Sequence, residues 1–207
     1  LWLFGAGLVR TPSNFGTAGD RPAQAELLDH LAARYIALGY STKKLIREIV
    51  LSETYQATSQ SNDANDKLDP DNRYFWRQNR RRLDAEALRD NLLAVAGTLD
   101  PKIGGESAPL DDKLRRRTIY ARISRYQQEG TLSLFDFPSA SVTCEQRANT
   151  NVPLQRLYFL NSDFLHLQAD ALAKNLAAKP DPVEAAYGLL FQRQPTAEEK
   201  KLATSFL

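Results

Sequence analysis

The chain has 207 residues, of which 43% are apolar and 25% are charged, so it is long enough for one domain with a hydrophobic core. Its net charge of +2 gives no electrostatic reason to expect nucleic-acid or membrane binding, and its single cysteine excludes an internal disulfide framework. No apolar run approaches the about 20 residues of a transmembrane helix, so no membrane span is expected.

The N-terminal residues 1–22 are expected to form a loop, because glycine and proline recur along them. No methionine precedes Leu1, and we expect a single helical domain over residues 1–207 that is N-terminally truncated. A helix is predicted over residues 23–38, with apolar residues at helical spacing and Gly39 as its stop. Ser41 should cap a second helix, over about 42–54, so that the two form an αα-hairpin.

The middle of the chain is more polar. Residues 56–69 are predicted to be a surface loop, and Asp69-Pro70 to open a short helix that carries an aromatic run, residues 74–76. Apolar residues at helical spacing predict a further helix over about 83–97. From Arg73 to Arg125 the chain has 13 basic and 7 acidic residues, a local net charge of +6.

Residues 100–116 are expected to be a loop, and the alternation from Arg117 to Ile123 predicts a short strand, paired with residues 131–135 or 141–144. The chain should be helical again from Pro153, with a break at Asn161-Ser162. Asp181-Pro182 should start a helix that ends near Phe191, and a capping box from Thr196 to Glu199 should start the last one. The fold class is therefore mainly α: an irregular helical domain of about six to seven helices with at most one small β hairpin.

Three groups of polar residues are candidates for a site. Arg82, Glu86 and Arg89 share one face of a predicted helix, which fits either an anion-binding cluster or a ladder of salt bridges that stabilises the helix. Asp136 lies between two aromatic residues ahead of a proline, and Gln155 lies near a helix start. Either could line a pocket. The simpler interpretation is that Asp136 accepts hydrogen bonds from backbone groups of a turn and that Gln155 does so at the start of a helix.

Cys144 and Arg147 form the third group, because a nearby cation can activate a thiol. A cysteine nucleophile also needs a base, and the only histidines, His30 and His166, lie in distant predicted helices, so a buried, unreactive cysteine is favoured. With so few histidines and cysteines we expect no metal and no cofactor in this chain.

A set of ordered short motifs spans nearly the whole chain. They are Gly7–Gly16, Glu26–Ala32, Asp69–Arg73, Asn79–Asp90, Phe135–Pro138, Cys144–Arg147, Pro153–Gln155, Leu160–Asn161 and Arg193–Glu199. Together they resemble the planctomycete secreted domain family, also called domain of unknown function 1553. The resemblance implies a C-terminal module of large exported bacterial proteins, periplasmic or extracellular, whose upstream domains are cytochrome-c-like, and so haem-containing, or uncharacterised. It implies no catalytic residues.

Two functions remain open from the sequence. The first is a non-enzymatic helical interaction or scaffold module of a larger exported multidomain protein, which docks on its upstream domains through the arginine-rich region 73–125. The alternative is part of a hydrolase-like or ligand-binding site for an anionic polymer or glycan, completed by neighbouring domains. Its candidate polar residues are Arg82, Glu86, Arg89, Asp136, Arg147 and Gln155.

The segment Phe135–Asn161 is also predicted to act as a structural clasp. In this hypothesis Phe135 and Phe137 pack against the helix that carries Leu88 and Leu92. Arg147 is expected to pair with Asp84, Glu86 or Asp90, because a buried guanidinium requires a carboxylate. Cys144 should then be buried.

Overall fold

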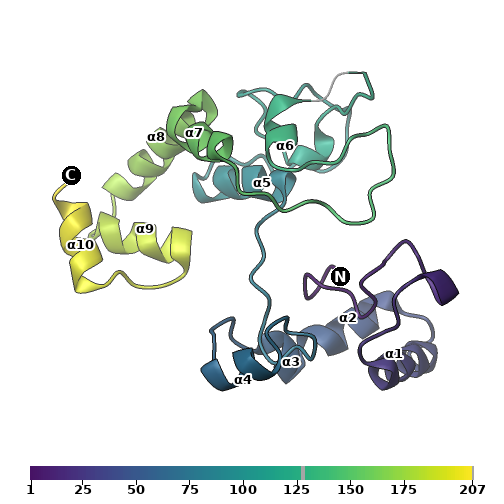
Figure 1. The fold of residues 1–207 in the computed structure, drawn as a ribbon. Coiled ribbons are helices and arrows are strands. Elements are labelled where there is room, and N and C mark those ends of the chain that lie inside the picture. The colour runs from purple at the N-terminus through teal and green to yellow at the C-terminus, as the bar shows by residue number, and fades with distance from the viewer. Residues whose placement is uncertain (127–128, 207) are drawn as a thin grey trace. The chain divides into compact units, whose positions relative to one another are not determined.

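A computed structural model describes residues 1–126 and 129–206 of the chain (Figure 1). Those residues form ten α-helices and two 3-10 helices without a sheet, which confirms the mainly α class. The chain divides into two compact units, Leu1–Arg82 and Leu83–Leu207. The expectation of one domain over residues 1–207 stays a prediction, which limited proteolysis can test.

The first unit begins with a loop that contains the 3-10 helix η1 (Gly16–Ala18), followed by α1 (Ala25–Ala37) and α2 (Thr42–Val50). α1 and α2 contact each other, so the predicted hairpin is confirmed. Gly39 ends α1 with a left-handed φ of 67°, and the Ser41 hydroxyl accepts the backbone N–H of Lys44 at the start of α2. The predicted second helix is shorter than expected, because Ser52 caps a separate helix, α3 (Glu53–Gln56).

The segment after α3 differs from its prediction. The expected loop at 56–69 contains a helix, α4 (Asp63–Leu68), because the Asn62 side chain accepts two backbone N–H groups at its start. The short helix expected from Asp69-Pro70 is wrong. The Asp69 carboxylate accepts the backbone N–H groups of Arg73 and Tyr74 at 2.8 and 2.9 Å, and it thereby folds residues 69–75 into a turn.

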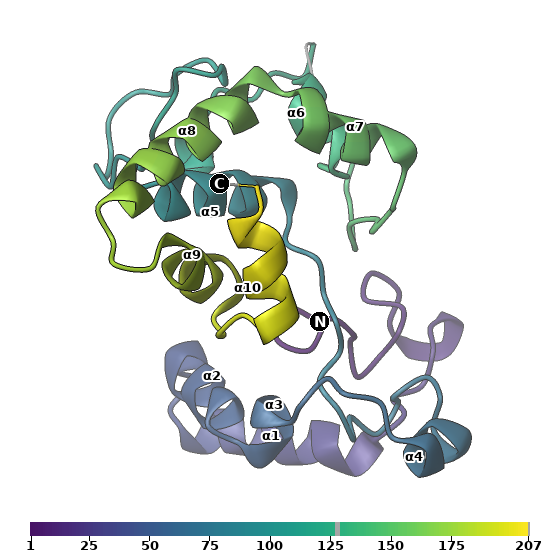
Figure 2. The ribbon, with the colours of Figure 1, turned by 90° about the vertical axis from the view of Figure 1, so that its left-hand side faces the viewer.

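The second unit is built around α5 (Ala85–Val95). This helix contacts the 3-10 helix η2 (Thr118–Tyr120), α6 (Gly130–Leu134) and α8 (Asp163–Ala177). α8 in turn contacts α7 (Pro153–Asn161) and α9 (Pro182–Phe191), and α9 contacts α10 (Ala197–Thr204) (Figure 2). The predicted helix break, the helix after Asp181 and the capping box of the last helix are all confirmed.

The strand predicted for Arg117–Ile123 is wrong, and so is the partner at 131–135, which is the helix α6. Asp90 on α5 accepts both the backbone N–H and the hydroxyl of Thr118 at 2.6 Å, which turns this segment into η2. The β structure in the described part of the chain consists of two isolated bridges, Asp100 with Arg116 and Ala108 with Ala121.

The hydrophobic core lies in the second unit. Ala85, Leu132 and Phe135 form its buried cluster. Partly buried side chains pack against this cluster: Leu88, Leu110, Leu134, Phe137 and Tyr158. The cluster joins Phe135 to Ala85 of α5, and Phe137 and Leu88 both pack against it, so the predicted packing of this segment on the helix that carries Leu88 and Leu92 is confirmed for Phe135.

The first unit has no such core. Within Leu1–Arg82, all of which is described, the buried side chains are the polar Asp69 and Asn72. Among the apolar residues of α1 and α2, Leu28, Ile36 and Ile46 are 39%, 57% and 41% exposed. The elements of the first unit therefore cover these side chains only in part. No helix in the described part of the chain is long and apolar enough to cross a membrane.

Candidate functional site

Glu86 and Arg147 form the strongest ion pair among the predicted site residues. The Arg147 guanidinium donates to both carboxylate oxygens of Glu86, at 2.6 and 2.8 Å, and lies 3.8 Å from Asp84. It also lies 5.2 Å from the ring centroid of Phe137. The predicted pairing of Arg147 with an acidic residue at the start of α5 is therefore confirmed. This contact fastens the long loop between α6 and α7 to α5.

The pair shifts the titration of both groups. Partial burial acts to raise the pKa of Glu86, but the hydrogen bonds from Arg147, the backbone N–H of Glu86 itself and the charge of Arg147 together hold that pKa below its ordinary value. The same hydrogen bonds raise the pKa of Arg147. Both side chains thus stay charged at neutral pH and remain paired.

Asp136 and Gln155 form hydrogen bonds at the two ends of the loop between α6 and α7. The Asp136 carboxylate accepts the backbone N–H and the hydroxyl of Thr150 at 2.9 and 2.7 Å. Gln155, which is buried, donates to the carbonyl of Leu134 at 2.8 Å and accepts the N–H of Val152 at 3.2 Å. Asp136 thus satisfies a backbone group of the loop, and the bond between Gln155 and Val152 satisfies a backbone group at the start of α7, as the simpler interpretation of the sequence expected.

Arg89 is only 6% exposed and organises a different loop. Its guanidinium donates to the carbonyl of Leu114, and it also donates to the carbonyls of Asp111 and Arg116 at 3.4 Å. It also lies 4.9 Å from the ring centroid of Phe164. Burial lowers the pKa of this guanidinium, and the charge of Asp90 opposes that effect. Arg89 therefore closes the loop that precedes η2.

The six predicted polar residues belong to different parts of the fold. Arg82 is the last residue of the first unit, and the other five belong to the second. Those five divide into the Glu86–Arg147 pair, the Asp136 and Gln155 bonds at the loop ends, and the Arg89 cluster. A role for them in binding or catalysis stays a prediction, since the contacts described here are ones that hold the fold.

Cys144 corrects one expectation. The cysteine was predicted to be buried, but it is exposed, and its thiol donates to the carbonyl of Gln146 at 3.3 Å. The loop between α6 and α7 runs along the surface, and Arg147 is the residue that anchors it. In the described part of the chain no group of three or more histidine, cysteine or acidic side chains is placed to hold a metal ion.

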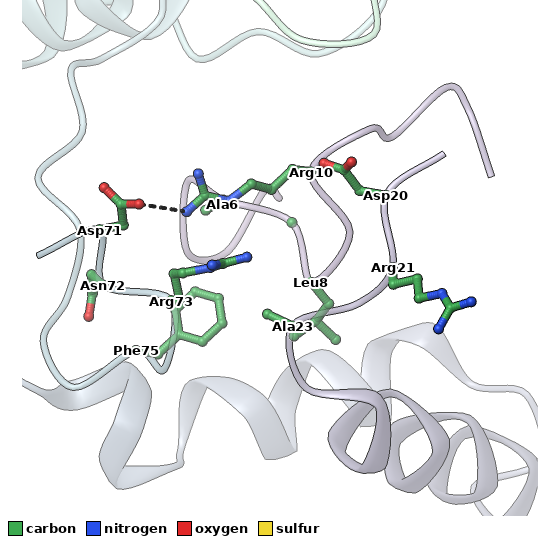
Figure 3. Close-up of a pocket in the computed structure, with 11 residues that line it drawn as sticks. Ala6, Leu8, Arg10, Asp20, Arg21, Ala23, Asp71, Asn72, Arg73 and Phe75 are labelled. Atoms are coloured by element: carbon green, nitrogen blue, oxygen red, sulfur yellow. Dashed lines mark ion pairs between the residues drawn. The ribbon is translucent and has the colours of Figure 1, made fainter. Parts of the chain in front are cut away.

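The first unit contains a cavity of about 240 Å³ that the sequence reasoning did not identify (Figure 3). Three arginines and two aspartates supply its charged lining: Arg10, Arg21, Arg73, Asp20 and Asp71. Leu8, Ala23 and Phe75 are among its apolar lining residues. The walls therefore come from the N-terminal loop and from the turn after α4.

Backbone and side-chain hydrogen bonds join these walls. The Ala23 N–H donates to the carbonyl of Leu8 at 3.3 Å, and the Gln24 amide donates to the carbonyl of Arg73 at 3.0 Å. The buried Asn72 donates to the carbonyl of Arg77 and to Asn79 at 2.7 and 3.0 Å. Asn79 in turn donates to the carbonyl of Phe4 at 2.9 Å. The N-terminal loop is thus held on the turn after α4.

Three arginines and two aspartates give the cavity lining a formal charge of +1. The Arg10 guanidinium is 3.9 Å from the Asp71 carboxylate, and both side chains are more than half exposed, so this ion pair is weak. Burial acts to raise the pKa of Asp69 behind the wall, but hydrogen bonds from Tyr74 and Arg73, with the charges of Arg73 and Arg10, bring it below its ordinary value.

The signal that could have found this cavity was present in the sequence. Two of its walls are the motifs Gly7–Gly16 and Asp69–Arg73, which supply Arg10 and Arg73. Nothing local in either motif indicates that residues so far apart in the chain meet.

The comparisons with known proteins give one result. A family model described as "PSD1: Protein of unknown function (DUF1553)" matches residues 1–207. No curated protein and no solved structure matches the chain.

Proposed function

We propose a function from the premise that the chain belongs to the PSD1 family of proteins of unknown function, whose model matches all of its residues. The proposed function is that of a helical interaction module that docks on other domains of the same polypeptide. A row of exposed leucines on α7 is the observation that carries this proposal.

α7 has two different faces. Gln155, which is 3% exposed, and the partly buried Tyr158 face the core of the second unit. Leu154, Leu157 and Leu160 follow one another at a spacing of three residues, and they are 62%, 49% and 69% exposed. A single exposed leucine is common, but three on one helix face leave apolar surface that a partner can cover at a gain of about 1.5–3 kcal/mol for each fully buried side chain.

The total surface supports the same proposal. The accessible surface of the chain is 15093 Å². Two separate compact domains of the sizes of these units would expose about 11,600 Å² by the usual scaling of surface with mass. The difference is about 3,500 Å², which exceeds the about 1,000–2,500 Å² that one partner contributes to an obligate interface.

These observations move the docking surface away from the arginine-rich region 73–125. Several arginines of that region already serve the fold: Arg89 is buried, and Arg116 donates to the carbonyl of Glu106 at 3.1 Å and lies 4.1 Å from the ring centroid of Tyr120. Apolar helix faces, rather than these arginines, are the surface that we propose for docking.

The cellular context follows from the resemblance described for the sequence. We propose that the module is part of a larger exported protein and that its partners are the haem-containing or uncharacterised domains upstream of it. Enzymatic activity is the alternative, and the engagement of Glu86, Arg147 and Asp136 in structural hydrogen bonds favours the non-enzymatic function.

Calorimetric titration of the chain with the upstream domains tests this proposal. The wild-type chain should bind, and the Leu157→Glu/Leu160→Glu double variant should bind at least about tenfold more weakly, because two charges replace apolar contacts. Ala173→Glu, at an exposed position on α8, is the matched control and should bind like the wild type. Absence of binding by the wild-type chain, or equal loss in the control, would contradict the proposal.

A further inference from the structure

We propose that the cavity between Arg10 and Arg73 binds a small organic carboxylate, one sugar ring or one amino acid in size. This inference goes beyond the docking function, because the cavity belongs to the first unit and the leucines of α7 to the second. The charge, the size and the backbone of the cavity each support it.

The charged groups of the lining fit a carboxylate that also carries hydroxyl or ammonium groups. Arg10 and Arg73 extend into the space between the two wall segments, whereas Arg21 points away from it (Figure 3). Arg10 and Arg73 are thus balanced by Asp20 and Asp71 in the lining, which suits such a ligand better than a doubly charged phosphate. Guanidinium groups match the two oxygens of a carboxylate, and Asp20 and Asp71 can accept from hydroxyl or ammonium groups on the same ligand.

The size and the apolar wall limit the rest of the ligand. At about 240 Å³ the cavity is smaller than the roughly 300–1,000 Å³ of sites for drug-sized molecules. The ring of Phe75 lies opposite the small apolar side chains of Leu8 and Ala23 (Figure 3). An apolar face of a sugar ring or an aliphatic side chain fits between them.

The backbone of the cavity wall is strained and firmly held. Asn72 and Phe75 have φ values of 51° and 53°, in the left-handed region that a bulky residue such as phenylalanine rarely adopts. The hydrogen bonds of Asp69 and Asn72 hold this conformation in place. Strain of this kind concentrates at ligand sites, where it fixes side chains before the ligand binds. Here it fixes Phe75 and Arg73.

An NMR titration of the ¹⁵N-labelled chain tests the inference with four probes. D-galacturonate and L-leucine each carry a carboxylate, and D-galactose and L-leucinamide are their counterparts without one. At least one acid should shift the amide signals of the cavity walls with a dissociation constant of about 10 mM or below, and its counterpart should bind at least about tenfold more weakly. Saturation by galacturonate alone identifies an acidic sugar, and saturation by leucine alone identifies an amino acid. If neither acid saturates, or the counterparts bind equally well, the inference is wrong.

Matched arginine variants locate the binding. Arg73→Gln and Arg10→Gln should each weaken binding of the acid at least about tenfold, because each removes a guanidinium from the cavity. Arg21→Gln removes the same charge from a side chain that points away, and it should change the affinity by less than about threefold. Circular dichroism shows whether each variant is folded. If one of the two cavity variants is unfolded, the other still tests the inference. Equal effects of all three would show that only the general positive potential matters, which would overturn the site.

This result is independent of the docking experiment. The Leu157→Glu/Leu160→Glu variant should bind the acid like the wild type. A chain that binds the acid but no upstream domain would therefore refute the docking function alone.

Discussion

Arg89 and Arg147 both hold loops of the second unit, yet they stabilise the fold in different ways. Arg89 is buried and bonds to the carbonyls of a loop, whereas Arg147 is about one quarter exposed and bonds to a carboxylate on α5. Arg89 extends from α5 to a loop, whereas Arg147 extends from a loop to α5. In each case the guanidinium supplies hydrogen bonds in place of the regular backbone bonds that a loop lacks. The loop that precedes η2 and the loop between α6 and α7 therefore each depend on one arginine.

Replacing Arg147 with alanine should lower the free energy of unfolding by about 2 kcal/mol. The Arg147 and Glu86 side chains are 26% and 27% exposed, so the loss falls between the about 0–1 kcal/mol of exposed pairs and the 3–5 kcal/mol of buried ones. Urea denaturation of the chain measures this change. The reason is that Glu86 keeps its charge without its bidentate partner, and the loop loses its anchor.

Arg156→Ala provides the control for this prediction. Arg156 lies on the exposed side of α7, in the segment that follows the same loop, so its removal should change the stability by less than about 0.5 kcal/mol. An Arg147→Ala variant as stable as the wild type would show that the loop is held by other contacts.

At the scale of single elements, the last helix depends on a charged cap. The Glu199 carboxylate accepts two hydrogen bonds from Arg193, at 2.8 and 2.7 Å, and the backbone N–H of Thr196 at 2.8 Å. These bonds lower the pKa of Glu199 to about 2 from its ordinary 4.5, and the hydrogen bonds from Arg193 make the largest contribution. The carboxylate also lies in the first turn of α10, where the helix dipole favours a negative charge.

The stabilisation that Glu199 gives to α10 should therefore be lost in acid. Because the pKa is lowered on folding, this contribution is fully present above about pH 4.5 and disappears as the pH falls toward about 2. The ¹³C shift of the Glu199 carboxyl group, followed by NMR, measures its titration. Arg193→Gln should move the midpoint upward, and a midpoint near 4.5 in the wild type would contradict the described cap.

Helices with strong local signals could be predicted from the sequence. The cap at Ser41, the stop at Gly39 and the capping box at Thr196 each act through residues within a few positions, and the structure has helix ends at all of them. The residues around Asp69 and Thr118 were misjudged for the opposite reason. The Asp69 carboxylate accepts the backbone N–H of Tyr74, and the Asp90 carboxylate accepts that of Thr118. These side-chain acceptors decide the local conformation, and propensity does not reveal them.

The candidate site shows the same limit. The excess of arginine near α5 was sufficient to predict that Arg147 would find an acidic partner, and it does. The burial of Cys144 was inferred from that contact, but one anchored arginine does not bury the rest of a surface loop. The cavity of the first unit was missed because Arg10 and Arg73 come from segments that only the folded chain brings together.

At the scale of the whole molecule, the buried apolar side chains are distributed unequally. All of those in the described residues lie between Ala85 and Val183, in the second unit. The first unit is held by hydrogen bonds among Asn72, Asn79 and the N-terminal loop, and its helices α1 and α2 keep apolar side chains exposed. Hydrogen bonds of this kind contribute only about 0.5–1.5 kcal/mol each, so the first unit should be the less stable of the two.

Limited digestion with trypsin tests this difference. Arg80, Arg81 and Arg82 are exposed, lie outside any helix and end the first unit, so the first cut should fall among them. The fragment 83–207 should then persist, whereas the fragment 1–82 should be degraded several times faster, because it lacks buried apolar side chains. Replacing the three arginines with glutamine should slow the first cut. If the wild-type chain instead resists cleavage at this segment, the expected single domain over residues 1–207 would be supported. A stable fragment 1–82 would show that its polar network suffices to hold it.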